Sequence, residues 1–260
     1  MLESLVIKSW SIGRMRCSCE MLTHKKCLSS FSVVRAVEGS YEIALDEGPR
    51  TVVAAGEIFI APAGAVQSIV HHDDPTSGTM AAQWVFIDLY VNGERIGDKM
   101  TFPVKVSGDE AKELGAVIRK IVDGDSAGRS AELVRLCALL LTVGKDNVQT
   151  DPEKERIKKY ILDHFSTRIS YKELAAYLNR SQASFYRFFG AHFGCSPSAY
   201  IHDLRLSHAA LLLETGADSV TAVAERCGYE DVHYFIKLFT NKFGRSPSRY
   251  RAVLRRTVVN

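Results

Sequence analysis

Two segments in the last third of the chain carry side chains suited to hydrogen bonding with base pairs. Each segment is predicted to be a helix, and the outward positions are Gln182, Ala183, Tyr186 and Arg187 in the first and Val232, His233, Tyr234 and Lys237 in the second. Arginine and lysine donate to guanine O6 and N7 or to phosphate, glutamine pairs with adenine, and small apolar side chains contact the thymine methyl group. Each residue alone is also an ordinary surface residue, so the interpretation depends on the elements that position it.

These two helices belong to an internal duplication, which is the strongest signal in the sequence. The segment Phe193–Tyr200 (FGCSPSAY) matches Phe243–Tyr250 (FGRSPSRY) at an offset of 50 residues. Other matches are Phe185 with Phe235 and Phe189 with Phe239 at the same offset, and Ala175 with Ala224 and Leu178 with Cys227 at an offset of 49. The change of offset predicts one inserted residue in the second turn. Each copy therefore reads as a helix, a short turn and a second helix, the layout that places a recognition helix in the major groove of DNA.

A long helix is predicted between the two copies. Ser196 caps this helix, Pro197 opens it, and it continues to about Glu214. About seventeen residues at 1.5 Å each span about 25 Å, which would hold the two recognition helices close to one DNA turn, about 34 Å, apart. The same capping rules predict caps at Ser170, Ser181, Ser196, Ser219 and Asp231, with glycines at 194, 216, 228 and 244 as breaks.

Charge is distributed unevenly along the chain. Residues 1–152 contain 16 basic and 20 acidic residues, whereas residues 153–260 contain 17 basic and 10 acidic ones. A basic half indicates polyanion binding, with a solvated basic face as the alternative. The sequence shows neither a secretory leader pattern nor an apolar run of about 18 residues, so we expect a cytoplasmic protein with no membrane partner and with reduced cysteines.

The stretch from about Ile157 to Arg255 resembles the DNA-binding domain of the AraC/XylS family of bacterial transcription regulators. The residues that carry the resemblance are Leu174 and Ala175 with Ser181, Phe185 and Phe189; Ser196–Ile201 with Leu204, Arg205 and Ala209–Leu212; and Val220–Arg251. The resemblance implies a seven-helix, double helix-turn-helix domain in which the eight outward residues named above face the bases. Gly190 and Ala191 stand where the family often has a polar or basic residue, so we expect the first copy to contribute more through shape and packing than through charge.

The first hundred residues read as short strands separated by turn signals, the pattern of a sandwich or barrel. The predicted strands are Ser32–Val37, Tyr41–Leu45, Thr51–Ala54, Ile58–Ile60, Ser68–Val70 and Trp84–Val91. This half resembles the cupin-like sensor domain of the same family, and Gly56–Gln67 fits the second cupin motif. Gln67 and His71 stand where that motif has histidine and asparagine, and Leu45 and Glu47 stand where the first motif has two histidines. The usual metal ligands are therefore absent, and no cofactor is expected.

A small organic effector is the expected ligand of this barrel. Gln83–Phe86 resembles the strand that offers a tryptophan to the sugar in arabinose-type sensors. Trp84 can stack on the apolar face of a sugar, with a core tryptophan as the alternative. Arg35, Glu38 and Gln67 are further candidates for lining the cavity.

Two groups of residues raise the question of a metal or thiol site. In His71-His72-Asp73-Asp74, adjacent strand residues point to opposite faces, so the two histidines are not expected to share one ion and a polar loop is preferred. The second group, Cys17, Cys19, His24 and Cys27, matches no common zinc spacing. Structural thiols are preferred there, with a redox or metal sensor left open.

The periodicity becomes helical after Ser107. The predicted helix Arg129–Val143 is apolar on more than one face. It is therefore expected either to pair with a twin subunit or to be buried within its own chain. Gly144–Thr150 reads as a linker, after which Asp151 and Pro152 start the next helix.

Together these features predict an α+β protein with an N-terminal cupin-like β-barrel, two following helices and an all-α double helix-turn-helix domain. The expected domains are residues 1–145, a linker at 146–152 and residues 153–260. We expect a regulator that binds double-stranded DNA and a small-molecule effector, forms a homodimer through Arg129–Val143 and contacts RNA polymerase, with activation or repression left open. A barrel enzyme with a DNA-binding appendage, or a regulator whose sensor binds a protein, are the alternatives.

Overall fold

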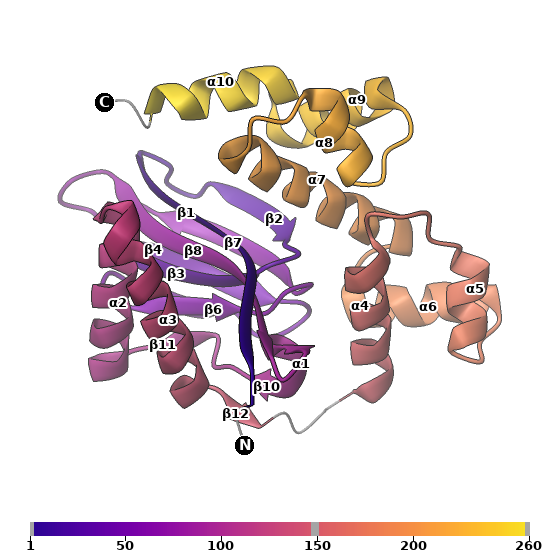
Figure 1. The fold of residues 1–260 in the computed structure, drawn as a ribbon, viewed down its shortest axis with the longest axis horizontal. Coiled ribbons are helices and arrows are strands. Elements are labelled where there is room, and N and C mark those ends of the chain that lie inside the picture. Colours follow the sequence, from indigo (N-terminus) through magenta and orange to yellow (C-terminus); the bar gives the residue numbers. More distant parts are fainter. Residues whose placement is uncertain (1–2, 147–150, 258–260) are drawn as a thin grey trace. The chain divides into compact units, whose positions relative to one another are not determined.

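The computed structural model describes residues 3–146 and 151–257 (Figure 1). The chain forms two compact units, each described here by itself. The N-terminal unit comprises Met1–Lys26 and Ser30–Asp151, and the C-terminal unit comprises Cys27–Ser29 and Pro152–Asn260. The first contains antiparallel sheets with helices and the second is helical, so the predicted α+β class is confirmed. Most of the predicted linker, residues 147–150, lies outside the described residues.

Two antiparallel sheets form the body of the N-terminal unit. The strands are β1 (Leu5–Cys17), β2 (Thr23–Cys27), β3 (Phe31–Glu38), β4 (Ser40–Leu45), β5 (Thr51–Ala54), β6 (Ile58–Ala61), β7 (Val66–His72), β8 (Met80–Val91), β9 (Glu94–Arg95), β10 (Met100–Thr101), β11 (Lys105–Val106) and β12 (Lys145–Asp146). One sheet has the order β1-β8-β3-β6-β11 with β9 on β8, the other has the order β2-β7-β4-β5, and β10 pairs with β12. Sequence reasoning missed β1, because this sheet-edge strand is mostly half-buried or exposed and has few buried apolar positions.

The two faces of β8 are buried against different partners. Val85, Ile87 and Leu89 belong to a core shared with α2 (Gly108–Asp123) and α3 (Ser126–Val143), which follow the short α1 (Ile96–Lys99). The alternate residues of β8, which include Met80, Ala82, Trp84 and Phe86, belong to a second core with residues of β4, β5 and β7. The period-2 alternation of the strand thus separates a helix-covered face from an inter-sheet interior.

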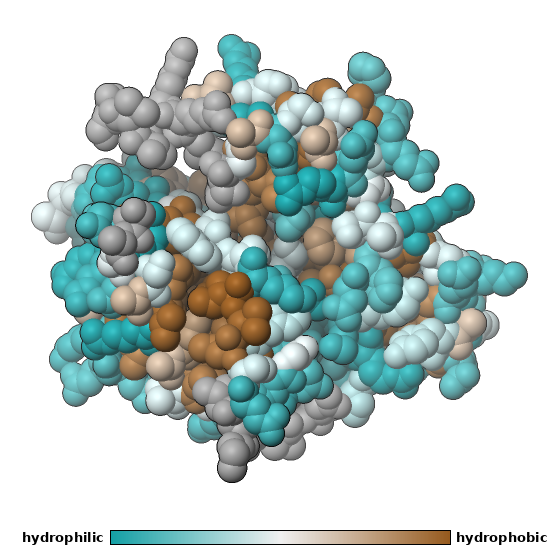
Figure 2. Space-filling view, in the orientation of Figure 1, coloured by the Kyte–Doolittle hydropathy of each residue, from teal (hydrophilic) through white to brown (hydrophobic). Residues whose placement is uncertain are grey.

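Helix α3 is apolar on more than one face, and its own unit covers part of that apolar surface. Leu136, Cys137 and Leu140 are fully buried in the core shared with α2, so these residues are packing positions within one chain. Val134, by contrast, is 58% exposed. Figure 2 shows apolar surface gathered over the part of this unit where α3 and the start of β1 lie.

The C-terminal unit is a series of short helices arranged along one long helix. They are α4 (Pro152–His164), α5 (Tyr171–Tyr177), α6 (Gln182–Phe193), α7 (Pro197–Thr215), α8 (Val220–Arg226), α9 (Val232–Phe243) and α10 (Pro247–Thr257). The predicted caps are confirmed, since side chains of Ser170, Ser181, Ser196, Ser219 and Asp231 accept hydrogen bonds from backbone amides in the first turns. Across both described stretches of the chain, the helices lack the length and apolar character that a membrane crossing requires.

Candidate nucleic-acid interface and effector site

The two repeated copies share one aromatic skeleton. Phe189 stacks on Phe193 with 4.2 Å between ring centroids and meets Tyr200 edge-on at 5.6 Å. Fifty residues later, Phe239 lies 4.4 Å from Phe243 and meets Tyr250 edge-on at 5.4 Å. The side chains that hold each recognition helix, Phe185, Phe189, Phe235 and Phe239, are all fully buried. Burial of such rings fixes which faces of α6 and α9 remain outward.

The turns that precede the recognition helices also match. Asn179 and Gly228, which are related by the offset of 49, adopt left-handed backbone with φ of 53° and 77°. The next amide in each copy, Arg180 or Tyr229, donates to the carbonyl of the matching alanine, Ala175 or Ala224, at 2.9 and 3.0 Å. The following caps are Ser181 and Asp231, so the predicted insertion is confirmed and lies between the turn and the second cap.

Seven of the eight predicted base-facing side chains are exposed. They are Gln182, Ala183, Tyr186 and Arg187 on α6 and His233, Tyr234 and Lys237 on α9. Val232 is half-buried against the core of the second copy, so part of its side chain serves packing. Two helices on matched skeletons thus present polar and aromatic groups to the outside.

A cleft of about 690 Å³ lies between the two copies. Its lining includes Tyr171 beside the first copy, His202 of α7, and Tyr234 of the second copy. Tyr171 meets Tyr186 edge-on at 6.2 Å, and His202 meets Tyr234 at 6.0 Å. Helix α9 therefore lines this cleft directly through Tyr234, whereas α6 contributes no lining residue and contacts the lining only through Tyr186 and Tyr171.

Several basic side chains of this unit are engaged internally. Arg205 donates to the carbonyls of Phe165 and Thr167, each at 2.6 Å, and its burial lowers its pKa. Arg180 pairs with Glu153, and Lys242 pairs with Asp203. Sequence reasoning did not separate these structural cations from the outward pair, Arg187 and Lys237. The sequence shows the basic residue types but not the carbonyl and carboxylate groups that bind some of them in the fold.

Comparison with known proteins shows what this architecture is similar to. Residues 174–252 match a family model described as a helix-turn-helix domain. The raffinose operon transcriptional regulatory protein RafR of Pediococcus pentosaceus is 28% identical over 238 residues, which cover 82% of each chain. The transcriptional activator RhaS of Escherichia fergusonii is 34% identical over 119 residues, which cover 46% of this chain and 42% of RhaS. These matches support the resemblance of this chain to the AraC/XylS family of transcription regulators, with a helix-turn-helix domain at residues 174–252.

The fold of the whole chain also has a solved counterpart. The crystal structure of ToxT from Vibrio cholerae aligns with a TM-score of 0.58 over 95% of this chain and 98% of ToxT, at 12% identity. At that identity the likeness concerns the fold. It places an antiparallel sheet unit before the helix-turn-helix unit in both proteins.

The four N-terminal residues that were predicted to bind an effector do not all lie together. Trp84 and Gln67 face the inter-sheet interior, where the Gln67 amide nitrogen donates to the hydroxyl of buried Ser32 at 3.4 Å. Arg35 lies on the opposite, helix-covered face and donates to Gln83 at 2.9 Å. Glu38 ends β3 and accepts from Arg16 and Thr79. Arg35 is thus placed away from Trp84, because it alternates with the interior residues Val34 and Ala36 along β3.

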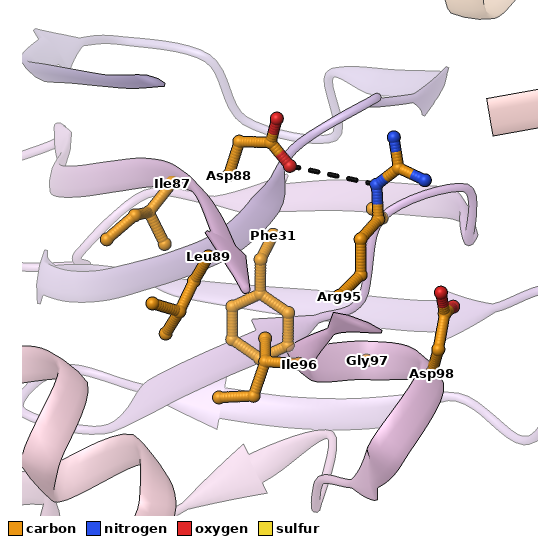
Figure 3. Close-up of a pocket in the computed structure, with 9 residues that line it drawn as sticks. Phe31, Ile87, Asp88, Leu89, Arg95, Ile96, Gly97 and Asp98 are labelled. Atoms are coloured by element: carbon orange, nitrogen blue, oxygen red, sulfur yellow. Dashed lines mark ion pairs between the residues drawn. The ribbon is translucent and has the colours of Figure 1, made fainter. Parts of the chain in front are cut away.

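A separate pocket at the β8–β9 end of the sheet is mainly a packing feature (Figure 3). Phe31, Ile87 and Ile96 line it, and Arg95 and Asp88 form an ion pair with 3.7 Å between Nε and Oδ1. Its free volume of about 10 Å³ accommodates about one water molecule. It contains none of the four predicted effector residues.

Proposed function

We propose that this chain regulates transcription by inserting α6 and α9 into successive major grooves of one DNA site, under the control of a small hydroxylated molecule bound in the N-terminal unit. The observation that carries the proposal is the pair of exposed faces of α6 and α9, which are held on matched aromatic skeletons. Helix α7 separates the two copies and contains 19 residues, which span about 28 Å. That length is compatible with the spacing of about 34 Å between major grooves on one face of DNA.

Direct readout is assigned to the outward polar groups. Arg187 and Lys237 donate to guanine O6 and N7 or to phosphate, and Gln182 pairs with adenine. Ala183 contributes apolar contact, as does the exposed part of Val232, while Tyr186, His233 and Tyr234 contact bases or the sugar-phosphate backbone. Gly190 and Ala191 leave the outer face of α6 without the polar or basic groups that the family often has there, so the contribution of the first copy rests more on shape.

Two unsatisfied polar atoms support an effector site between the sheets. The indole nitrogen of Trp84 and the amide oxygen of Gln67 are buried, and within the described residues neither has a hydrogen-bond partner. A buried polar atom without a partner is costly, and a bound hydroxyl group can satisfy either one. Trp84 and Gln67 are connected through two other residues. The ring of Phe86 lies 6.1 Å from that of Trp84, Phe86 is paired with Ser32 in the sheet register, and Ser32 contacts Gln67.

A sugar or sugar-like molecule fits these features. Trp84 offers an aromatic face and a donor, and Gln67 offers an acceptor. RafR is named for a raffinose operon, which supports the sugar class, whereas a ToxT structure has been determined with an unsaturated fatty acid bound. The relatives named above are regulators, so the ligand is proposed as an effector and we assign no catalytic reaction to the sheet unit.

The remaining partners follow from the same proposal. RNA polymerase is the expected contact once the regulator occupies DNA. A homodimer would form through the exposed face of the 129–143 segment of α3, where Val134 is the most exposed large apolar residue. Leu136 and Leu140 are excluded from that surface, because they are buried in the core of their own unit.

The effector proposal is tested by tryptophan fluorescence in a chain that retains only Trp84. The sequence contains two tryptophans, so Trp10→Phe leaves Trp84 as the sole reporter. Neutral oligosaccharides should change its emission saturably, and Gln67→Leu in the same background should weaken that response at least tenfold. A response to fatty acids and none to sugars would overturn the sugar assignment. An unchanged response in Gln67→Leu would remove Gln67 from the site.

The DNA proposal is tested independently by selecting binding sites from a random DNA pool with the full chain. The expected result is a site with two conserved segments about 10 base pairs apart, one for each recognition helix. A single short conserved segment would contradict the use of both copies. Repeating the selection with and without sugar would show whether the effector changes affinity or spacing.

A further inference from the structure

The structure brings together the two groups of cysteines and histidines that are separate in the sequence. His71 of β7 is 4% exposed and lies against Cys19, which follows β1, and against Met80, which begins β8. Its Nδ1 atom is 3.8 Å from the Cys19 sulfur and 3.3 Å from the Met80 sulfur. Cys19 is 9% exposed and Met80 is fully buried, so both sulfur atoms approach Nδ1 below the surface, and the Cys19 sulfur also lies 3.7 Å from the Asp73 carboxylate.

The second nitrogen of the His71 ring has a partner that can fix the tautomer. His71 Nε2 is 3.2 Å from His24 Nδ1 on the neighbouring strand β2. A neutral imidazole ring carries one N–H, on either Nδ1 or Nε2. When Nε2 donates that hydrogen to His24, the lone pair of Nδ1 points toward the two sulfur atoms. A hydrogen bond to the distal nitrogen is the arrangement that orients metal-binding histidines.

We infer that Cys19, His71 and Met80 form a binding site for a soft monovalent metal ion, namely Cu(I). Bonds of about 2.0 Å to nitrogen and 2.3 Å to sulfur, with an angle near 120°, would separate the two donors by about 3.7 Å. The two observed nitrogen–sulfur distances, 3.3 and 3.8 Å, lie close to that value. Thiolate and thioether ligands select Cu(I) over harder ions.

The donor set argues against zinc as the ion. Within residues 3–146 and 151–257, no group of three or more histidine, cysteine, aspartate or glutamate side chains is arranged to hold a metal ion. The thioether of Met80 supplies the third donor beside Cys19 and His71, and a thioether suits a soft ion. His72 lies on the other side of β7, where it contacts Glu20 and Glu42, so it is not a ligand.

Coordination requires Cys19 to lose its proton. Burial is the main reason that the pKa of Cys19 is raised to about 12, so the free protein holds a thiol at pH 7. Cu(I) would form a bond to sulfur as the thiol releases its proton to water, with no change in oxidation state. Cys17 lies directly opposite Met80 in the β1–β8 register, which makes it a candidate for a fourth ligand. The site would link the two sheets, because His71 and Met80 belong to different ones.

The test is a titration of the full chain with Cu(I) under nitrogen, against a colorimetric Cu(I) chelator as competitor. The wild type should bind one Cu(I) per chain. Cys19→Ser should weaken this binding at least a hundredfold and Met80→Leu at least tenfold, while His24→Phe should cost about tenfold through the hydrogen bond to His71. Met100→Leu and Cys195→Ser are the matched controls and should bind as the wild type does.

Folding and the rival explanations are checked in the same samples. Circular dichroism identifies any variant that fails to fold, and Met80→Leu keeps the volume of a fully buried side chain nearly constant. X-ray absorption of the copper complex should show sulfur and nitrogen ligands. Equal Cu(I) affinity in the wild type and in Met80→Leu, or tighter binding of Zn(II) than of Cu(I), would overturn the proposal. Because no DNA or sugar is present, these outcomes are independent of the proposed regulatory function.

Discussion

The two helix-turn-helix copies have the same interior and different surroundings. Phe189 and Phe239 occupy equivalent positions with equivalent ring partners, and the turns at Asn179 and Gly228 use the same hydrogen bonds. Outside this skeleton the copies diverge. The first turn is tied to α4 by the Arg180–Glu153 ion pair, whereas Tyr229 of the second turn lies under the Arg205 guanidinium and beside His202 of α7.

The comparison shows which features the two copies have kept in common. The buried rings, the turn geometry and the caps determine how each recognition helix is held, and these features repeat. The residues that attach each copy to the rest of the unit do not repeat, and among the outward residues only the basic pair Arg187 and Lys237, 50 residues apart, repeats in charge. Each copy can therefore read its own sequence while it keeps a common fold.

The largest effect should come from removing the shared rings. Phe189→Ala and Phe239→Ala should each destabilise the C-terminal unit by about 3–5 kcal/mol, because each deletes a fully buried ring. Urea unfolding should be followed by helical circular dichroism, since both tryptophans lie in the N-terminal unit. Strongly unequal losses would show that the two skeletons are not equivalent.

The turns should respond unequally to the same substitution. A Cβ at Gly228 would lie 2.7 Å from the Ser166 carbonyl oxygen, and φ is positive there, so Gly228→Ala should cost about 2 kcal/mol or more. Asn179→Ala keeps a side chain that is already accommodated and should cost about 1 kcal/mol or less. The comparison uses the same unfolding measurement. Equal costs would mean that Ser166 moves away without penalty.

The outward cations should matter for DNA and not for folding. Arg187→Ala and Lys237→Ala should each weaken specific binding by about 1–3 kcal/mol if they contact bases, with no change in unfolding. Lys112→Ala, which removes an exposed cation from the N-terminal unit, is the control. Fluorescence anisotropy with the selected site gives the affinities. Unchanged affinity in either variant would remove that residue from the interface.

The smallest effect should appear at the caps of the recognition helices. Asp231 accepts from the amides of His233 and Tyr234, whereas Ser181 accepts from the amide of Ser184. Loss of a cap costs about 1 kcal/mol, and the charged Asp231 also interacts favourably with the helix N-terminus. Asp231→Ala should therefore destabilise more than Ser181→Ala in urea unfolding. The reverse order would indicate that the inserted residue weakens the second cap.

Sequence reasoning worked best where local rules decide the structure. The caps, the long helix after Pro197 and the insertion in the second turn follow from residue types and spacing alone. It worked less well where the outcome depends on contacts between distant segments. The placement of Arg35 on the helix-covered face and the meeting of Cys19 with His71 and Met80 depend on strand pairing, which the spacing of residues along the chain does not reveal.

The central claim is that the two copies read two grooves of one site, and hydroxyl-radical footprinting tests it most directly. The wild type should protect two segments on one face of the duplex, about 10 base pairs apart. Arg187→Ala should weaken protection mainly in one segment and Lys237→Ala mainly in the other. A single protected segment, or loss of the same segment in both variants, would contradict the account.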